Sequence, residues 1–168
     1  LAGNIVEHLR SVKSAENLSV SDKPEFIILD ITHRCNLQCN ICEIRKDKPI
    51  QEFTTEEVKG LILQSIEWGV KEFVFSGGEP FIRKDIFELL DFIKQKDYHV
   101  GILTNGILLD QDFVQRLLPY LVSGRLSLSI SLDALSSHIH DDIRGVQGAF
   151  EKTSKGLNII SEFRKQNP

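Results

Sequence analysis

Residues 25–42 read EFIILDITHRCNLQCNIC, a short apolar run that leads directly into a polar segment. The run 25–31 is rich in residues that favour β-structure, which predicts a buried strand. The segment 32–48 shows no helical periodicity and holds all three cysteines of the chain, Cys35, Cys39 and Cys42. In parallel α/β folds, sites are built just beyond the carboxyl ends of strands. The stretch therefore predicts where the sheet begins and where a site lies.

An alternation of strand and helix continues along the rest of the chain. Apolar, β-rich runs predict three further strands, at 73–75, 99–103 and 126–132. Amphipathic periodicity predicts four helices, at 54–69, 83–96, 110–121 and 148–164. Four strands that are each followed by a helix predict an α/β fold with a parallel sheet and right-handed crossovers. Four such units make an open half barrel or a small doubly wound sheet.

The first 23 residues differ in character from the rest. Apolar residues spaced as on one helix face predict a short leading helix there, followed by a polar linker. We expect one α/β core at 24–168, because a single domain is the natural prior at this length. The chain begins at Leu1, contains no methionine and ends in a polar stretch. We therefore expect it to be part of a longer protein.

The composition argues against two classes of function. The net charge is −4, so the chain lacks the basic excess that marks nucleic-acid binding. Its apolar runs are too short to span a bilayer, and no leader pattern is visible at the start. We expect a cytoplasmic protein that acts on neither nucleic acid nor membranes.

The cysteines follow the spacing C-x3-C-x2-C. Three cysteines cannot all pair as disulfides, and clustered thiols in a reducing compartment more often hold metal or do chemistry. Iron–sulfur clusters usually take four cysteines, so three would leave one iron open to an outside ligand. A zinc site that adds His33 to the three thiols is an alternative. A closed cluster with a fourth ligand from another segment is a second alternative.

This spacing, with Ile41 before the last cysteine, resembles the signature of the radical S-adenosylmethionine (SAM) enzymes. The resemblance implies that Cys35, Cys39 and Cys42 ligate three irons of a 4Fe–4S cluster. The amino and carboxylate groups of SAM would take the fourth iron. It also favours the partial (β/α) barrel, of which this chain would form the first four β–α units.

Two further motifs follow predicted strands in the expected order. Taken alone, both are ordinary turns. Ser76-Gly77-Gly78-Glu79-Pro80 is similar to the GGEP motif of the family, whose backbone pairs with the SAM amino group. Thr104-Asn105-Gly106 is similar to the TNG segment, which lies near the cosubstrate. The resemblance therefore implies that both turns contribute to a SAM site.

The last predicted strand alternates strictly between apolar and polar residues. Taken alone, it would be an edge strand with one wet face. In a barrel, its apolar face (Leu126, Leu128, Ile130 and Leu132) would meet the helices, and its polar face would line the lumen. The resemblance implies that three polar residues lie near the ribose or other polar groups of SAM, namely Ser129, Ser131 and Asp133.

A stretch beyond this strand, His140-Asp141-Asp142-Ile143-Arg144-Gly145, resembles the H-D-x-x-R-G segment of the same branches of the family. The resemblance implies that Arg144 pairs with the SAM carboxylate, since guanidinium groups bind carboxylates in a two-pronged geometry. A plain surface arginine is the alternative. We expect His138 and His140 to be exposed or helix-capping.

The resemblance implies reductive cleavage of SAM to methionine and a 5′-deoxyadenosyl radical, which abstracts hydrogen from a substrate. It implies a small-molecule or peptide substrate and an electron donor such as flavodoxin or ferredoxin. The residues that follow GGEP, Phe81 to Asp85, are typical of the molybdenum-cofactor and peptide-modifying branches. No catalytic acid or base is identified. A non-catalytic iron–sulfur or zinc module, for electron transfer or folding, is the alternative function.

Overall fold

Four strands form one parallel sheet in the order β1-β2-β3-β4 in the computed structural model, which describes residues 24–44 and 51–166. The strands are β1 (Phe26–Thr32), β2 (Glu72–Gly77), β3 (His99–Thr104) and β4 (Leu126–Ile130). Each strand pairs with its neighbour in sequence, so the predicted parallel α/β architecture is confirmed. The predicted leading helix and linker lie outside the described residues.

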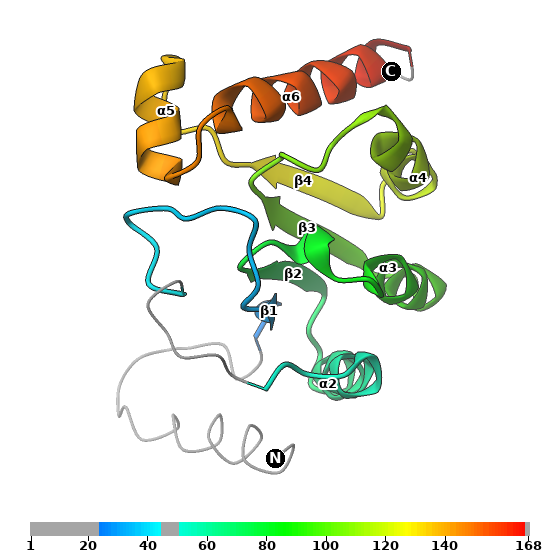
Figure 1. Ribbon diagram of the computed structural model, residues 1–168. Helices are drawn as coiled ribbons and strands as arrows, with labels where there is room; N and C mark the ends of the chain where they lie inside the picture. The colour runs from blue at the N-terminus through cyan, green and yellow to red at the C-terminus, as the bar shows by residue number, and fades with distance from the viewer. Residues whose placement is uncertain (1–23, 45–50, 167–168) are drawn as a thin grey trace, which may run out of the picture.

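Helices connect the strands and follow the last one (Figure 1). They are α2 (Thr55–Glu67), α3 (Ile86–Gln95), α4 (Gln111–Leu121), α5 (Ser137–Arg144) and α6 (Ala149–Gln166). The predicted capping box is present at the start of α2, where Thr54 and Glu57 bond to each other's backbone. Pro119 lies within α4, which continues beyond it to Leu121.

One helical prediction needs correction, and one helix of the structure had no counterpart among the predictions. The helix expected from residue 83 begins at Ile86, because the 3₁₀ helix η3 (Pro80–Ile82) precedes it and Arg83 has an extended backbone. Helix α5 was not predicted as a helix. Its eight residues carry few apolar side chains, so they lack the periodic signal on which helix prediction relies.

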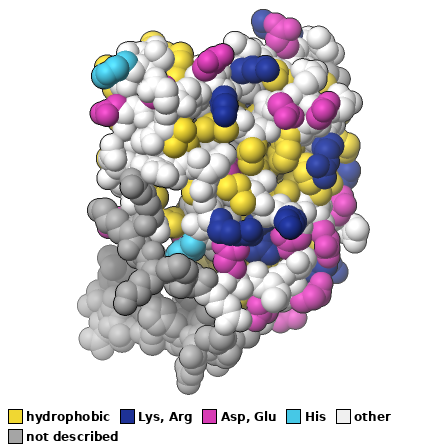
Figure 2. Space-filling view, in the orientation of Figure 1, with side chains coloured by type: hydrophobic (Ala, Val, Ile, Leu, Met, Phe, Trp, Pro, Cys, Tyr) yellow, Lys and Arg dark blue, Asp and Glu magenta, His cyan; other side chains and the backbone are white. Residues whose placement is uncertain are grey.

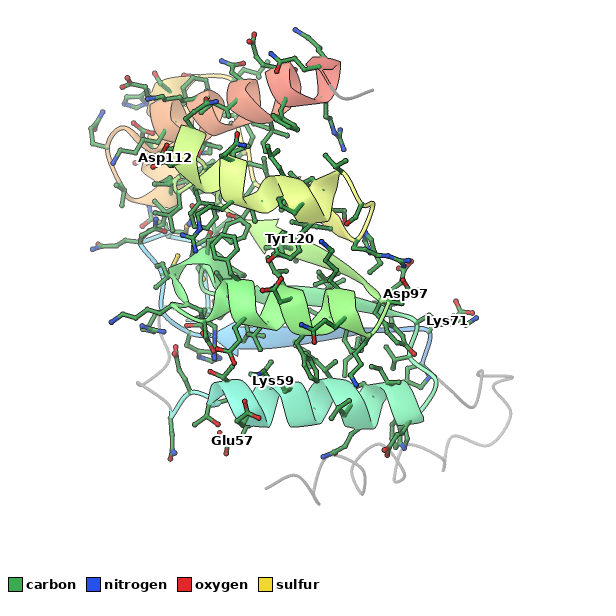
Figure 3. All side chains as sticks on the ribbon, turned by 90° about the vertical axis from the view of Figure 1, so that its right-hand side faces the viewer. Glu57, Lys59, Lys71, Asp97, Asp112 and Tyr120 are labelled. Carbon is green, nitrogen blue, oxygen red and sulfur yellow. The ribbon has the colours of Figure 1, made fainter. Side chains whose placement is uncertain are left out.

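The hydrophobic core lies between one face of the sheet and the helices. Phe73, Phe75, Val100 and Ile102 belong to this core, and α2, α3 and α4 lie side by side in front of the sheet in Figure 3. On the opposite face of β1, Phe26 and Ile28 are exposed. The described residues therefore cover one face of the sheet and leave the other open.

Strand β4 is two residues shorter than predicted. Leu126 is buried, and Leu128 and Ile130 pack against the core, so the apolar face points to the helices as expected. Leu132 does not join this face and is 37% exposed. The chain leaves the sheet after Ser131, whose N–H donates to the carbonyl oxygen of Thr104 at 2.9 Å.

Polar side chains tie the helices together across the surface. Lys59 on α2 bonds to Glu88 on α3 at 2.6 Å, and the Tyr120 hydroxyl on α4 donates to Asp91 on α3 at 2.7 Å (Figure 3).

Figure 2 shows charged side chains of both signs interspersed with hydrophobic ones. None of the helices in the described part of the chain has the length and hydropathy needed to cross a membrane.

Candidate functional site

A pocket of about 420 Å³ opens at the carboxyl ends of the strands. Its size is in the range typical of small-molecule sites. Eleven residues predicted to form the site line it: Cys35, Cys39, Ile41, Cys42, Ser76, Gly77, Gly78, Thr104, Asn105, Ser131 and Arg144. Cys35 and Arg144, which are 109 positions apart in the sequence, thus share one cavity.

The glycine turn after β2 holds the start of the cysteine loop. The N–H of Gly78 donates to the carbonyl oxygen of Thr32 at 2.7 Å, and the N–H of Glu79 donates to that of Arg34 at 2.8 Å. A Cβ atom on Gly78 would lie 2.2 Å from the Arg34 oxygen. Glycine is therefore needed here because two backbones meet without space for a side chain.

Helix α5 holds the middle of the same loop. The N–H of Gln38 donates to the carbonyl oxygen of Arg144 at 3.1 Å, and the N–H of Asn40 donates to that of Ile143 at 3.0 Å. Gly145 ends the helix in the left-handed region, with φ +66°, as glycine commonly does. A Cβ atom there would lie 2.2 Å from the Gln38 oxygen. The loop is thus bound between the glycine turn and the end of α5.

The three cysteines are free thiols that line the same pocket. The Cys35 sulfur accepts a hydrogen bond from the N–H of Leu37 at 3.4 Å, and Arg144 Nη1 lies 3.8 Å from the Cys39 sulfur. Desolvation raises the pKa of Cys35. The Leu37 N–H opposes this rise, while nearby acidic groups, the other two cysteines included, add to it.

The donor set has the chemistry of an iron–sulfur site. Three thiols line one cavity, which is the donor chemistry of iron–sulfur clusters, where each thiolate meets a different iron. Within residues 24–44 and 51–166, no three His, Cys, Asp or Glu side chains converge as ligands of one metal ion. His33 lines the pocket, and its Nδ1 is buried without a hydrogen-bond partner among the described residues.

Glu79 supports the site through the hydrogen bonds of its buried side chain. Its carboxylate is fully buried and accepts hydrogen bonds from Thr104 Oγ1 at 2.9 Å, Asn105 N at 2.8 Å and Phe81 N at 3.1 Å. Burial raises the pKa of this carboxyl, and the three hydrogen bonds oppose the rise. The side chain thereby ties the glycine turn to the end of β3, and Glu79 itself does not line the pocket.

Asn105 links β3 to the cysteine loop. Its Nδ2 donates to Asn36 Oδ1 at 2.7 Å and lies 3.9 Å from the Cys35 sulfur, while its Oδ1 accepts from the N–H of Ile107 at 3.0 Å. Both polar ends of the side chain are therefore engaged within the protein. Its place beside Cys35 suggests that it orients the loop.

Arg144 and Asp133 form an ion pair with each other. Arg144 Nε lies 2.5 Å from Asp133 Oδ2, and Nη2 donates to Oδ1 at 3.0 Å. This pairing leaves Nη1 as the guanidinium nitrogen directed at the cysteines. Asp133 does not line the pocket itself. The Arg144 side chain is 14% exposed and paired with Asp133, so it is not a plain surface arginine.

Predictions for four other residues can be compared with the structure. Ser129 is exposed on β4, and Pro80 is buried in η3, and neither lines the pocket. His138 is exposed as expected. His140 is not: it is only 1% exposed, packs edge-on against Phe150 and accepts a hydrogen bond from the N–H of Asp133 at 3.3 Å.

Four lining residues lay outside the site that the resemblance implied, namely His33, Leu37, Ile44 and Leu103, and of these His33 was named only as a possible zinc ligand. Three of them flank the cysteines in sequence, so proximity to the motif was an available signal. Leu103 had none, because its place depends on which face of β3 turns toward the pocket.

Comparison with known sequences gives one family. A family model described as the radical SAM superfamily matches residues 29–166. An AdoMet-dependent heme synthase of Methanosarcina barkeri is 33% identical over 145 residues, which cover 85% of this chain and 41% of the relative. The antilisterial bacteriocin subtilosin biosynthesis protein AlbA of Bacillus subtilis is 31% identical over 140 residues, which cover 83% and 31%. The chain thus spans less than half the length of these relatives.

Comparison with solved structures gives the same fold. Streptococcus suis SuiB bound to S-adenosylmethionine matches with a TM-score of 0.70 at 21% identity, over 97% of this chain and 36% of SuiB. SuiB bound to precursor peptide SuiA also matches with a TM-score of 0.70. The predicted partial-barrel fold class is confirmed by this likeness and by the four-stranded parallel sheet.

Proposed function

The chain belongs to the radical SAM superfamily, and from this premise we propose that it is the part of an enzyme that holds a 4Fe–4S cluster and S-adenosylmethionine. One observation carries the proposal: the cysteines, the glycine turn, Ser131 and Arg144 line a single pocket at the carboxyl ends of the strands. In parallel α/β folds this end of the sheet is where ligands bind.

In the proposed site, Cys35, Cys39 and Cys42 would hold the cluster, and SAM would complete its ligand set. When bound and reduced, the cluster would supply the electron that cleaves SAM to methionine and a 5′-deoxyadenosyl radical, which then abstracts hydrogen from the substrate. The protein's own work is to orient both groups and to exclude water. The Leu37 N–H that bonds to Cys35 would stabilise a thiolate there.

The polar groups around the cysteines suit the parts of SAM. The N–H groups of Gly78 and Glu79 already bond to the loop, so this turn would meet the SAM ammonium through carbonyl oxygens. Arg144 Nη1 would meet the SAM carboxylate, with Asp133 holding the guanidinium in position. Ser131 would bond to the ribose. Asp133 would reach SAM only if its pairing with Arg144 changed.

We propose a peptide or a cofactor precursor as the substrate. Two findings support this: relatives include a heme synthase and a bacteriocin biosynthesis protein, and SuiB has been solved with a precursor peptide bound. The electron donor would be a small redox protein such as flavodoxin or ferredoxin. A cytoplasmic location follows from the need to keep three thiols reduced.

The test is SAM cleavage by the full-length protein that contains this chain. The protein is reconstituted anaerobically with iron and sulfide, reduced and given SAM, and 5′-deoxyadenosine is measured. Cys39→Ala should abolish cluster binding and product. Ser131→Ala should retain the cluster but weaken SAM binding by about threefold to tenfold, the worth of one hydrogen bond.

Ser127→Ala is the matched control, because Ser127 lies on the same strand but outside the pocket. It should bind SAM as the wild type does. Reconstituted wild-type protein that carries only zinc, or that holds a cluster but leaves SAM intact, would contradict the proposal and favour a non-catalytic metal module.

A further inference from the structure

The two ends of the cysteine loop are joined by a side chain that no motif includes. Glu52 lies beside the end of β1, although 18 to 20 residues separate them along the chain. Its Oε1 accepts hydrogen bonds from Thr32 Oγ1 at 2.5 Å and His33 N at 3.1 Å, and its Oε2 accepts one from Arg34 Nε at 3.1 Å. One carboxylate thus contacts the three residues immediately before Cys35.

Arg83 makes a second connection between the same two segments. Its side chain is 5% exposed, and its Nη1 donates to the carbonyl oxygens of Ile31 at 2.6 Å and Phe53 at 3.1 Å. Asp85 holds the guanidinium in place, accepting from Nε at 2.9 Å and from Nη2 at 2.5 Å. Arg83 therefore fastens the end of β1 to the chain that returns from the loop.

These hydrogen bonds differ in how much they stabilise the loop. The Glu52 side chain is 23% exposed, so its ion pair with the more exposed Arg34 is screened by solvent and contributes little. Thr32 is buried, and its hydroxyl bonds to a charged acceptor, which makes a stronger hydrogen bond than a neutral one. The contact between Glu52 and Thr32 is therefore the one whose loss should matter most.

Contacts at the base limit the conformations of the described part of the loop, which carries the three cysteines. Without these contacts, the described backbone hydrogen bonds of the loop would be those to the glycine turn and to α5. A ligand set works only when its members are held within a narrow range of positions. Joining the ends before the cluster arrives lowers the entropy that cluster binding would otherwise have to remove.

We propose that Glu52 is a positioning residue that, with Arg83, closes the base of the cysteine loop and holds the three thiols in place before any cluster is bound. That the thiols receive a cluster rests on the proposed function. The closure itself rests only on the contacts of Glu52 and Arg83 and can be tested in protein without metal.

The experiment measures how fast each cysteine is alkylated in the full-length, metal-free, reduced protein. Iodoacetamide is the probe, and mass spectrometry identifies the site. Glu52→Ala and Thr32→Val should each raise the alkylation rate of the loop cysteines by about threefold to tenfold, the worth of a net hydrogen bond. Glu67→Ala, which removes an exposed carboxylate at the end of α2, should leave the rate unchanged.

The double variant separates positioning from a general loss of stability. If Thr32 and Glu52 act through their mutual hydrogen bond, the double variant should raise the alkylation rate only slightly more than either single variant does. Its increase should be well below the product of the two single increases. Circular dichroism checks that each variant is folded, and if Glu52→Ala is not, Thr32→Val alone carries the same expectation. Wild-type alkylation rates in a folded variant, or fully multiplicative effects, would overturn the proposal.

Cluster retention provides a second readout. In reconstituted protein, iron should be lost to a chelator several times faster from Glu52→Ala than from Glu67→Ala. Wild-type protein that takes up no cluster would contradict the proposed function, yet the alkylation rates would still decide whether Glu52 closes the loop.

Discussion

Single glycines decide how closely the cysteine loop approaches its supports. Gly78 and Gly145 lie on opposite sides of the loop, and a Cβ atom on either would come within 2.2 Å of a loop carbonyl oxygen. Both positions therefore act as contact surfaces between two backbones. A methyl group at either one would displace the loop from its support.

We expect Gly145→Ala to destabilise the protein more than Gly124→Ala does. The two glycines have nearly the same backbone, with φ +66° and +69°, but Gly124 has nothing within 4 Å of the added Cβ. The control should cost about 1–2 kcal/mol, the strain of a left-handed alanine. Gly145→Ala should cost more, because the methyl group also collides with Gln38. Urea denaturation at neutral pH measures both.

Equal costs would mean that the loop moves away from α5 without loss of stability. In that case the hydrogen bonds of Gln38 and Asn40 to α5 would not be holding the loop. Cysteine alkylation of the same two variants would show whether the loop had been released.

Helix α5 matters as an element because it joins the loop to α6. Asp141 lies in α5, and its carboxylate accepts from the N–H groups of Gly148 and Phe150, each at 2.7 Å. These are backbone donors at the start of α6, which have no partner within their own helix. The bond from Phe150 is the main reason that the pKa of Asp141 is lowered, desolvation opposing it and the Gly148 bond adding to it.

Asp141→Ala should therefore loosen both helices at once. We expect a fall in the urea midpoint several times that of Asp142→Ala, because the Asp142 side chain is exposed on the same helix. We also expect faster hydrogen exchange at the start of α6 in the first variant alone. Similar effects from the two aspartates would show that the α5–α6 junction does not depend on this carboxylate.

At the scale of the whole molecule, carboxylates at the loop base link stability to pH. Desolvation acts to raise the pKa of Asp85, but hydrogen bonds from Arg83 and Thr55 and the nearby positive charge outweigh it and lower the pKa below 3.8. Glu52 follows the same pattern: desolvation is opposed by bonds from Thr32 and His33, and its pKa falls below 4.5. Burial raises the pKa of Glu79, so the ionisation of this carboxyl lowers the stability of the fold, the opposite of the effect of Asp85 and Glu52.

A lowered folded-state pKa contributes stability above the unfolded value and loses it as the pH falls through the folded value. We therefore expect Asp85→Asn to destabilise the protein at about pH 6, and the difference from wild type to shrink progressively below about pH 4. Urea denaturation across this range measures the difference at each pH. Glu67→Ala should differ from wild type by a similar small amount throughout. If the difference in stability between Asp85→Asn and the wild type stayed the same at every pH, the charge of Asp85 would not be involved.

Much of the architecture could be predicted from local patterns. The apolar run 25–31, the capping box at Thr54 and the alternation of β4 each depend on neighbours along the chain, and short-range periodicity reflects such neighbours directly. The position of the cysteines, the glycine turn and Thr104 after successive strands followed from the same patterns. Because parallel strands end at one edge of a sheet, sequence order alone brought these motifs together.

The sequence by itself thus determined the parallel sheet, the order of its elements and the edge at which the site lies. Only the tertiary structure decided that Glu79 and His140 are buried, that Asp133 pairs with Arg144, and that Glu52 bonds to Thr32. These features depend on contacts between residues far apart in the chain, such as Arg144 and Cys39, which are 105 positions apart. Local sequence periodicity does not predict such contacts. They form only when the elements pack and exclude water, because each buried polar group then needs a hydrogen-bond partner within the protein.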